Sequence, residues 1–89
     1  MKEGIIMRIR YFAWLKDHTG CSQETLALPQ EVSTIAQLIA HLEGRGAGYQ
    51  RAFQNREVVR VAINQEFATH NDTIDDRDEI GFFPPVTGG

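Results

Sequence analysis

The sequence has few cysteines, few positive charges and no long apolar segment, and each shortage excludes a class of protein. Cys21 is the single cysteine, so no disulfide can form within the chain, and the reducing cytoplasm is the expected setting. Lys and Arg number 9 against 12 Asp and Glu, which argues against nucleic acid or an anionic membrane as the main partner because both require a concentrated basic face. No apolar run approaches the roughly 20 residues of a membrane span. We therefore expect a cytoplasmic protein that binds neither nucleic acid nor membrane.

The sequence also lacks the residue spacings that are typical of metal sites and of enzyme active sites. His18, His41 and His70 are widely separated, and no His-x-x-x-His or Cys-x-x-Cys spacing is present. The acidic run 72–79 lacks the glycine and the ligand spacing of a calcium loop, and the glycines within 44–48 lack the Gly-Lys-Ser/Thr sequence of a phosphate loop. No nucleophile with an adjacent base can be selected. The sequence therefore predicts no metal site, no permanently bound cofactor and no enzyme activity of this chain on its own.

The length and composition predict one folded domain followed by a tail. With 89 residues, of which 42% are hydrophobic and 24% charged, the chain suffices for one hydrophobic core and is too short for two. We expect residues 1–83 to form a single domain, in which residues 1–4 are a loose leader and Met7 is an alternative start. Residues 84–89 are expected to form an extended, flexible tail.

Apolar residues alternate in the first part of the chain, which predicts a β-hairpin. Over residues 5–12 the apolar positions on one face are Ile5, Met7, Ile9 and Tyr11. A short helix or loop over residues 13–19 ends at Gly20, because glycine best accepts a left-handed helix cap. Residues 22–28 then form a second strand that pairs with the first.

One helix has a clear start signal. Thr34 and Gln37 match a capping box, and apolar residues follow at helical spacing, namely Ile35, Leu38, Ile39 and Leu42. The glycines within 44–48 are expected to end this helix. Residues 49–54 allow one further helical turn before the chain becomes extended again.

The second half of the chain predicts strands. Residues 58–64 are the most strand-like and are expected to lie centrally, followed by a tight turn at Asn64-Gln65 and a brief extended piece over residues 66–68. Ile74 is expected to be buried, and residues 80–83 form the last strand. This order predicts an α+β fold in which a mixed sheet of about five strands packs on one main helix. A single helix can cover only one face of that sheet.

The aromatic residues on the uncovered face predict a docking surface. By strand alternation Phe12 and Phe83 point away from the helix, and Phe67 lies in a segment too short to bury it fully. Such aromatic residues on a polar sheet face form a patch for a protein partner. Two other interpretations stay open: loops cover these rings, or the rings complete a second small core.

The C-terminal segment, Pro84-Pro85-Val86-Thr87-Gly88-Gly89, is predicted to leave the sheet. Proline lacks the backbone donor that a strand needs and restricts the residue before it, so the last strand cannot continue past Phe83. Six residues at about 3.3–3.6 Å each reach roughly 20 Å, which is enough to thread a narrow pocket in another protein. Gly88 and Gly89 have no side chain to block such a channel. The reactive group of this segment is the free C-terminal carboxylate of Gly89.

Three segments of the chain resemble the family of molybdopterin synthase small subunits. The most specific is Asp-Glu-Ile-Gly-Phe-Phe-Pro-Pro-Val-Thr-Gly-Gly at residues 78–89. The others are Met-Arg-Ile-Arg-Tyr-Phe-Ala at residues 7–13 and Val-Ala-Ile-Asn-Gln at residues 61–65. Arg77 departs from the family, which often has glycine in an Asp-Gly-Asp-Glu turn. Arg77 is strained by about 1 kcal/mol or more if that turn requires a positive φ, and otherwise the turn has another shape.

The resemblance implies a β-grasp, ubiquitin-like fold and a sulfur carrier that is not itself the catalyst. Gly89 would be the acceptor. An E1-like adenylating enzyme uses ATP and magnesium to convert its carboxylate to an acyl-adenylate, and sulfur from a sulfur-donating enzyme converts this to a thiocarboxylate. In the family, the tail enters the active site of the large synthase subunit and donates sulfur to cyclic pyranopterin monophosphate, in molybdenum cofactor biosynthesis. The tail residues here are Pro84, Pro85, Val86, Thr87 and Gly88.

The same resemblance implies how the partner is bound. Phe12, Phe67 and Phe83 match the family's hydrophobic docking surface, and the synthase is a heterotetramer of two small and two large subunits. Three other functions remain open. The first is a sulfur carrier for thiamine synthesis or tRNA thiolation. The second is a ubiquitin-like modifier whose Gly89 forms a bond with lysines of target proteins. The third is an interaction module in which Gly-Gly is only a frayed end.

Overall fold

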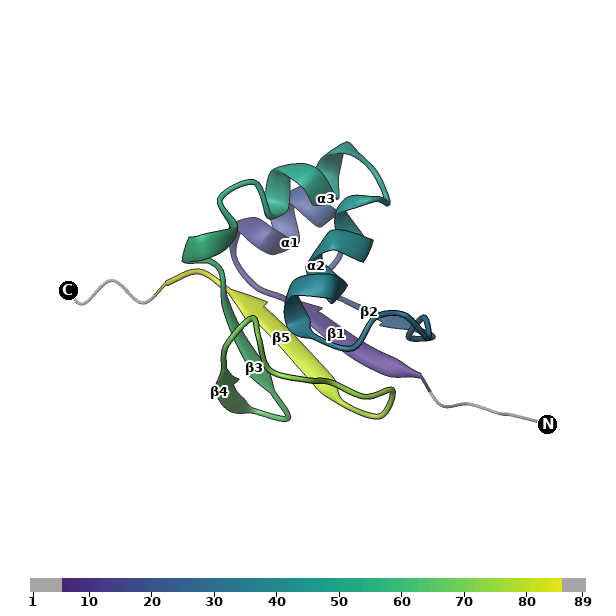
Figure 1. Cartoon of the computed structure of the whole chain (residues 1–89). Helices are drawn as coiled ribbons and strands as arrows, with labels where there is room; N and C mark the ends of the chain where they lie inside the picture. Colours follow the sequence, from purple (N-terminus) through teal and green to yellow (C-terminus); the bar gives the residue numbers. More distant parts are fainter. Residues whose placement is uncertain (1–5, 86–89) are drawn as a thin grey trace.

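The structure is a computed structural model that describes residues 6–85, in which helices cover one face of a β-sheet (Figure 1). The strands are β1 (Met7–Tyr11), β2 (Gln23–Leu26), β3 (Arg60–Ile63), β4 (Glu66–Ala68) and β5 (Glu79–Phe83). The helices are α1 (Trp14–Thr19), α2 (Ile35–Glu43) and α3 (Ala47–Ala52), and a 3-10 turn, η1 (Arg56–Val58), precedes β3. The predictions for the leader, residues 1–4, and for Val86 to Gly89 lie outside the described residues.

The sheet has five strands in the order β2-β1-β5-β3-β4. β1 and β5 run parallel, and the other neighbouring strands are antiparallel. The predicted α+β, β-grasp fold, with a mixed sheet and one main helix, is therefore confirmed. The segment expected to lie centrally, residues 58–64, contributes β3, which is an interior strand paired with β5 and β4. The middle strand is nevertheless β5, and Val58 belongs to η1 instead of the strand.

The core lies between the sheet and α2. The predicted alternation in β1 is confirmed, since Met7, Ile9 and Tyr11 are buried and their neighbours are exposed. The apolar face of α2 is fully buried against them, at Ile35, Leu38, Ile39 and Leu42. Burying each such side chain stabilises the fold by about 1.5–3 kcal/mol. Within residues 6–85, no helix covers the opposite face of the sheet (Figure 1).

The start of α2 is fixed by its own residues and by a distant loop. The Thr34 hydroxyl accepts the Gln37 N–H at 3.2 Å, and the Gln37 side chain accepts the Thr34 N–H, so the predicted capping box is confirmed. The carbonyls of Asp72 and His70 accept the next backbone N–H groups, which a helix cannot satisfy internally. Ile74 is buried as predicted, at 7% exposure.

Two short helices lie on the same side of the sheet as α2 (Figure 1). α1 ends at Gly20, whose φ of 85° is left-handed as predicted. α3 begins at Ala47, so a helix is present where only a turn over residues 49–54 was expected, and it includes Gly48. A Cβ on Gly48 would clash with the His18 carbonyl oxygen, so glycine here permits α3 to pack closely on α1.

Two turns complete the sheet. Asn64 and Gln65, with φ of 52° and 72°, form the predicted tight turn between β3 and β4. Arg77 is not among the residues with positive φ, and its N–H donates to the Asp75 side chain at 2.9 Å. The turn before β5 therefore differs in shape from one that requires a positive φ at this position, as a glycine in an Asp-Gly-Asp-Glu turn allows. Arg77 carries no backbone strain.

Candidate functional site

The uncovered face of the sheet carries the aromatic residues that strand alternation placed there. Phe12 follows β1 and is 41% exposed, Phe67 in β4 is 83% exposed, and Phe83 ends β5 and is half-buried. The rings of Phe67 and Phe83 lie 5.8 Å apart between centroids. No second core covers these rings within residues 6–85, so the patch is open to a partner. We call Phe12, Phe67 and Phe83 the aromatic patch.

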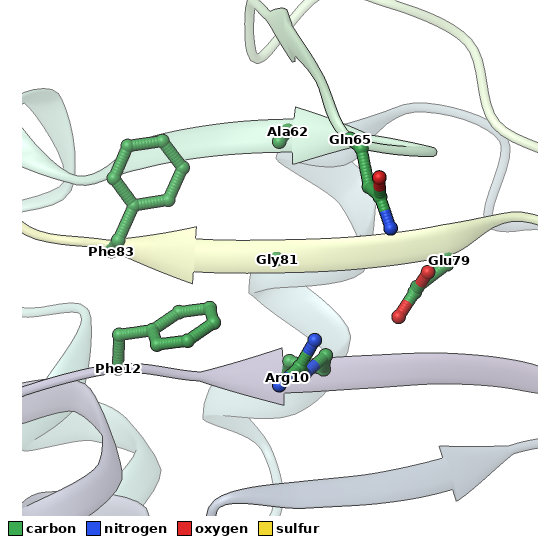
Figure 2. Close-up of a pocket in the computed structure, with 7 residues that line it drawn as sticks. All are labelled: Arg10, Phe12, Ala62, Gln65, Glu79, Gly81 and Phe83. Carbon is green, nitrogen blue, oxygen red and sulfur yellow. The ribbon is translucent and has the colours of Figure 1, made fainter.

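A cavity of about 180 Å³ lies on this face beside the aromatic patch. Its floor is the backbone of Gly81 and the small side chain of Ala62, so the absence of bulk at these positions creates the hollow. Figure 2 shows the Phe12 and Phe83 rings at one end and polar side chains at the other, namely Arg10, Gln65 and Glu79. The cavity suits an apolar group of a partner that has polar groups at one side.

Arg10 extends the aromatic patch with a positive charge. Its guanidinium carbon lies 5.3 Å from the centroid of the Phe12 ring, which is the geometry of a cation–π contact. Strand alternation places Arg10 on the same face as Phe12, two residues away, so the sequence contained the signal for this contact. The role of Gly81 and Ala62 in the cavity could not be predicted, because it depends on which strands lie next to these small residues in the sheet.

The turn after Phe12 contains a strained residue. Ala13 has φ 55° and ψ −129°, outside the left-handed region in which non-glycine residues with positive φ usually lie. Such a conformation costs of order 1–3 kcal/mol. It lies directly beside the aromatic patch. This strain could not be predicted from the sequence, because alanine is not a typical turn residue.

The tail leaves the sheet beside the aromatic patch. β5 ends at Phe83 as predicted, and Pro84 and Pro85 follow, each half-buried. The Phe12 N–H donates to the Phe82 carbonyl at 3.1 Å, so the end of β1 and the start of the tail are adjacent. The other predicted tail residues, Val86, Thr87, Gly88 and the acceptor Gly89, lie outside the described residues.

A cluster around Glu24, which the sequence did not reveal, joins the sheet to α3 and to the segment that precedes it. The Glu24 carboxylate accepts hydrogen bonds from Tyr11 at 2.8 Å, Tyr49 at 2.9 Å and Arg45 at 2.6 Å. Burial alone raises the pKa of Glu24, but these hydrogen bonds outweigh it and hold the pKa below its ordinary value. Burial and the bond to Glu24 raise the pKa of both tyrosines. This cluster lies on the helix side and fixes the fold behind the aromatic patch.

The remaining candidate groups do not converge. Across residues 6–85, no group of three or more His, Cys, Asp or Glu side chains is arranged to hold a metal ion. The His70 ring donates to the Val59 carbonyl at 2.9 Å, which ties the loop before Ile74 to the start of β3. Cys21 is half-buried against the core. Among the described helices, none is long and apolar enough to cross a membrane.

The five-stranded mixed sheet with α2 across one face defines the β-grasp class of ubiquitin-like folds. Residues 9–89 match the sequence profile of the ThiS family. The chain therefore belongs to the ThiS family of sulfur carriers, and the match includes the C-terminal Gly88-Gly89.

Relatives named as molybdopterin synthase sulfur carrier subunits match along nearly their whole length. The protein of Dictyostelium discoideum is 33% identical, over 92% of this chain and 94% of its own. The human protein is 31% identical, over 93% of each chain.

Solved structures share the fold at lower identity. Small archaeal modifier protein 1 of Haloferax volcanii has a TM-score of 0.70 at 23% identity, over 93% of this chain and 100% of its own. A chain from the complex of subunits 1 and 2 of the molybdopterin-converting factor of Helicobacter pylori has a TM-score of 0.60 at 22% identity, over 94% of this chain and 99% of its own.

Proposed function

We propose that this chain is the sulfur-carrying small subunit of a molybdopterin synthase. The observation that carries the proposal combines sequence and geometry. The chain matches the ThiS family through Gly89, and its last strand ends with Pro84-Pro85 beside the exposed aromatic patch. The full-length relatives named as molybdopterin synthase sulfur carrier subunits support this pathway over other uses of the family. The Phe-Phe-Pro-Pro sequence at residues 82–85 supports the same choice.

The chemistry takes place at the C-terminal carboxylate. A carboxylate is a poor electrophile until one of its oxygens belongs to a good leaving group, so an E1-like enzyme first joins Gly89 to AMP, using ATP and magnesium and releasing pyrophosphate. Sulfur at the sulfide level, supplied by a sulfur-donating enzyme, then attacks the acyl carbon and displaces AMP, which leaves a thiocarboxylate. This anionic sulfur attacks cyclic pyranopterin monophosphate as a nucleophile, and hydrolysis of the acyl carbon–sulfur bond then leaves sulfur on the acceptor and returns the Gly89 carboxylate. The chain therefore supplies no catalytic side chain and binds no cofactor permanently.

The large synthase subunit is the proposed partner of the aromatic patch. Phe12, Phe67 and Phe83 bind it while the tail from Pro84 to Gly88 enters its active site, in a cytoplasmic assembly of two small and two large subunits. The match to a chain from the Helicobacter pylori complex of subunits 1 and 2 supports the pairing of a small with a large subunit. Exposed aromatic side chains are suitable anchors because such residues supply most of the binding free energy at protein interfaces.

A second candidate function is a ubiquitin-like modifier, which the similarity to small archaeal modifier protein 1 favours. In this case Gly89 forms an isopeptide bond with lysines of target proteins. Conjugates that persist on a denaturing gel distinguish the modifier from a carrier, which remains a free chain of 10.0 kDa. A carrier for thiamine or tRNA thiolation has the same tail but a different sulfur acceptor.

Reconstitution tests the choice of pathway. The thiocarboxylated chain is mixed with the large subunit of its own organism and cyclic pyranopterin monophosphate, and molybdopterin is measured. Formation of molybdopterin that requires the thiocarboxylate supports the proposal. If a verified thiocarboxylate yields none while the large subunit is active with its known carrier, the chain serves another pathway.

A further inference from the structure

We propose that two arginines, Arg10 and Arg60, make the aromatic patch selective for a partner surface on which apolar side chains are flanked by carboxylates. The inference deepens the function proposed above and rests on it, because it states which chemistry the large synthase subunit presents to this face. It starts from an imbalance of charge. The whole chain has 9 Lys and Arg against 12 Asp and Glu, yet its uncovered sheet face is basic.

The strands show which charged residues share the uncovered face. Arg8 and Arg10 alternate with the buried residues of β1, and Arg60 precedes buried Val61 in β3. The one acidic residue that the described strands place on this face is Glu79, which pairs with Arg8. The uncovered face is therefore positive while the chain as a whole is negative. Such a face is complementary to an acidic surface and steers association toward it.

Each of the two arginines lines an apolar cavity on this face. The first cavity, of about 180 Å³, is bordered by Arg10 and the Phe12 ring (Figure 2). The second cavity, of about 270 Å³, is lined by Arg60 and Phe67. Phe83 lines both cavities, because β5 lies between β1 and β3. A partner can therefore place one apolar side chain in each cavity, with an arginine beside each of them.

The hydrogen-bond donors of both arginines are available to a partner. Within residues 6–85, ion pairs are present at Arg45 and Arg56, whereas Arg10 and Arg60 are exposed and have none. Arg10 lies over the Phe12 ring, at 5.3 Å from its centroid. This contact uses the face of the guanidinium and leaves its N–H groups for a carboxylate, which can accept two parallel hydrogen bonds from them.

The rings and the arginines have different roles in recognition. Aromatic rings supply binding free energy toward any apolar surface, whereas charges beside them distinguish one apolar surface from another. An arginine that becomes covered by an apolar surface loses its hydration without a new partner, and one that faces a positive charge is repelled. Arg10 and Arg60 therefore select partners that bring carboxylates beside their apolar anchors.

Charge reversal tests this selection in binding to the large synthase subunit. Arg10→Glu and Arg60→Glu should each weaken the affinity about tenfold or more, measured by calorimetry, because repulsion replaces attraction. Arg51→Glu is the matched control, since it makes the same change at an exposed position of α3 on the helix side, and it should leave the affinity within about twofold. Thermal unfolding checks that each variant is folded. Equal losses of affinity at all three positions would overturn the proposal.

Salt dependence separates charge from lost packing. The affinity of the natural chain for the large subunit should fall between about 50 mM and about 500 mM NaCl, because salt screens exposed charges. A double variant, Arg10→Gln with Arg60→Gln, keeps much of the side-chain bulk. It should bind more weakly at low salt and respond less to added salt. The same salt dependence in both proteins would overturn the proposal.

A small probe tests the first cavity without the large subunit. Phenylbutyrate joins a phenyl ring to a carboxylate, and phenylbutylamine joins the same ring to a positive charge. In NMR titrations of the free chain, phenylbutyrate should shift the Gly81 and Phe83 amides at a several-fold lower concentration than the amine, and Arg10→Gln should remove this preference. Lack of a preference for the carboxylate in the natural chain would overturn the proposal. A natural chain that shows the preference but does not bind the large subunit would support the selectivity and count against the proposed function alone.

Discussion

The rings of Phe67 and Phe83 meet across β3, with centroids 5.8 Å apart and planes tilted by 47°. Phe67 pairs with Ala62 and Phe83 with Arg60, so the two rings are diagonal neighbours on one sheet face. Phe67 nevertheless remains 83% exposed. The contact therefore orders an aromatic surface without burying it, as a docking surface requires.

Replacing Phe67 should separate binding from folding. Phe67→Ala removes a ring that is 83% exposed, so we expect the free energy of unfolding to change by less than about 0.5 kcal/mol. Affinity for the large synthase subunit, measured by calorimetry, should fall about tenfold or more because exposed aromatic anchors dominate interfaces. Ile6→Ala is the matched control, since Ile6 is an exposed apolar residue that precedes β1 at the end away from Phe12. An equal loss of affinity in both variants would count against the aromatic patch.

Filling the space at Gly48 should destabilise the packing of α3 on α1. In Gly48→Ala the new methyl group meets the His18 carbonyl, a backbone atom that cannot rotate away. We expect a loss of about 1–3 kcal/mol in urea unfolding. Gln50→Ala, at an exposed position of the same helix, should change stability little. A Gly48→Ala protein as stable as the natural chain would show that the two helices are not held this closely.

The Glu24 cluster predicts a loss of stability in acid. The folded state lowers the pKa of Glu24 from its ordinary value of 4.5, so its ionisation stabilises the fold above that pH, and the contribution disappears as the pH falls through the lowered value. Glu24→Gln should therefore be less stable than the natural chain at pH 7, and the difference should shrink in acid. Urea unfolding across this range checks the prediction. Glu31→Gln, an exposed charge removal outside the cluster, is the control. A difference that stays constant with pH would refute the role of the ionised carboxylate.

Features encoded by neighbouring residues could be predicted from the sequence. The Thr34 and Gln37 capping box, the Asn64-Gln65 turn and the alternation in β1 depend on local spacing, and each is present as expected. The same alternation placed Phe12 and Phe83 on the uncovered face. These elements were sufficient to infer an α+β fold with a mixed sheet on one helix and the direction in which the aromatic patch faces, whereas the β-grasp assignment came from the family resemblance.

Features that depend on distant contacts could not be predicted. β5 is central although it contains Gly81, because strand position follows from pairing with β1 and β3 and not from β-branched content. The Glu24 cluster joins residues that are 21 and 25 positions apart. Gly48 resembles a helix breaker in the sequence, yet close packing on α1 requires it within α3. The strain at Ala13 is equally invisible, because it arises from the sheet and the core on either side of that residue.

The most direct test of the sulfur-carrier function is the intact mass of the chain after incubation with ATP, magnesium, a sulfur source and the adenylating enzyme of its own organism. A variant that lacks Gly89 is treated in parallel. Exchange of one carboxylate oxygen for sulfur predicts a gain of about 16 Da that appears only when Gly89 and ATP are present, because adenylation must precede the exchange. An unchanged mass, with an adenylating enzyme proven active on its known carrier, would contradict the account.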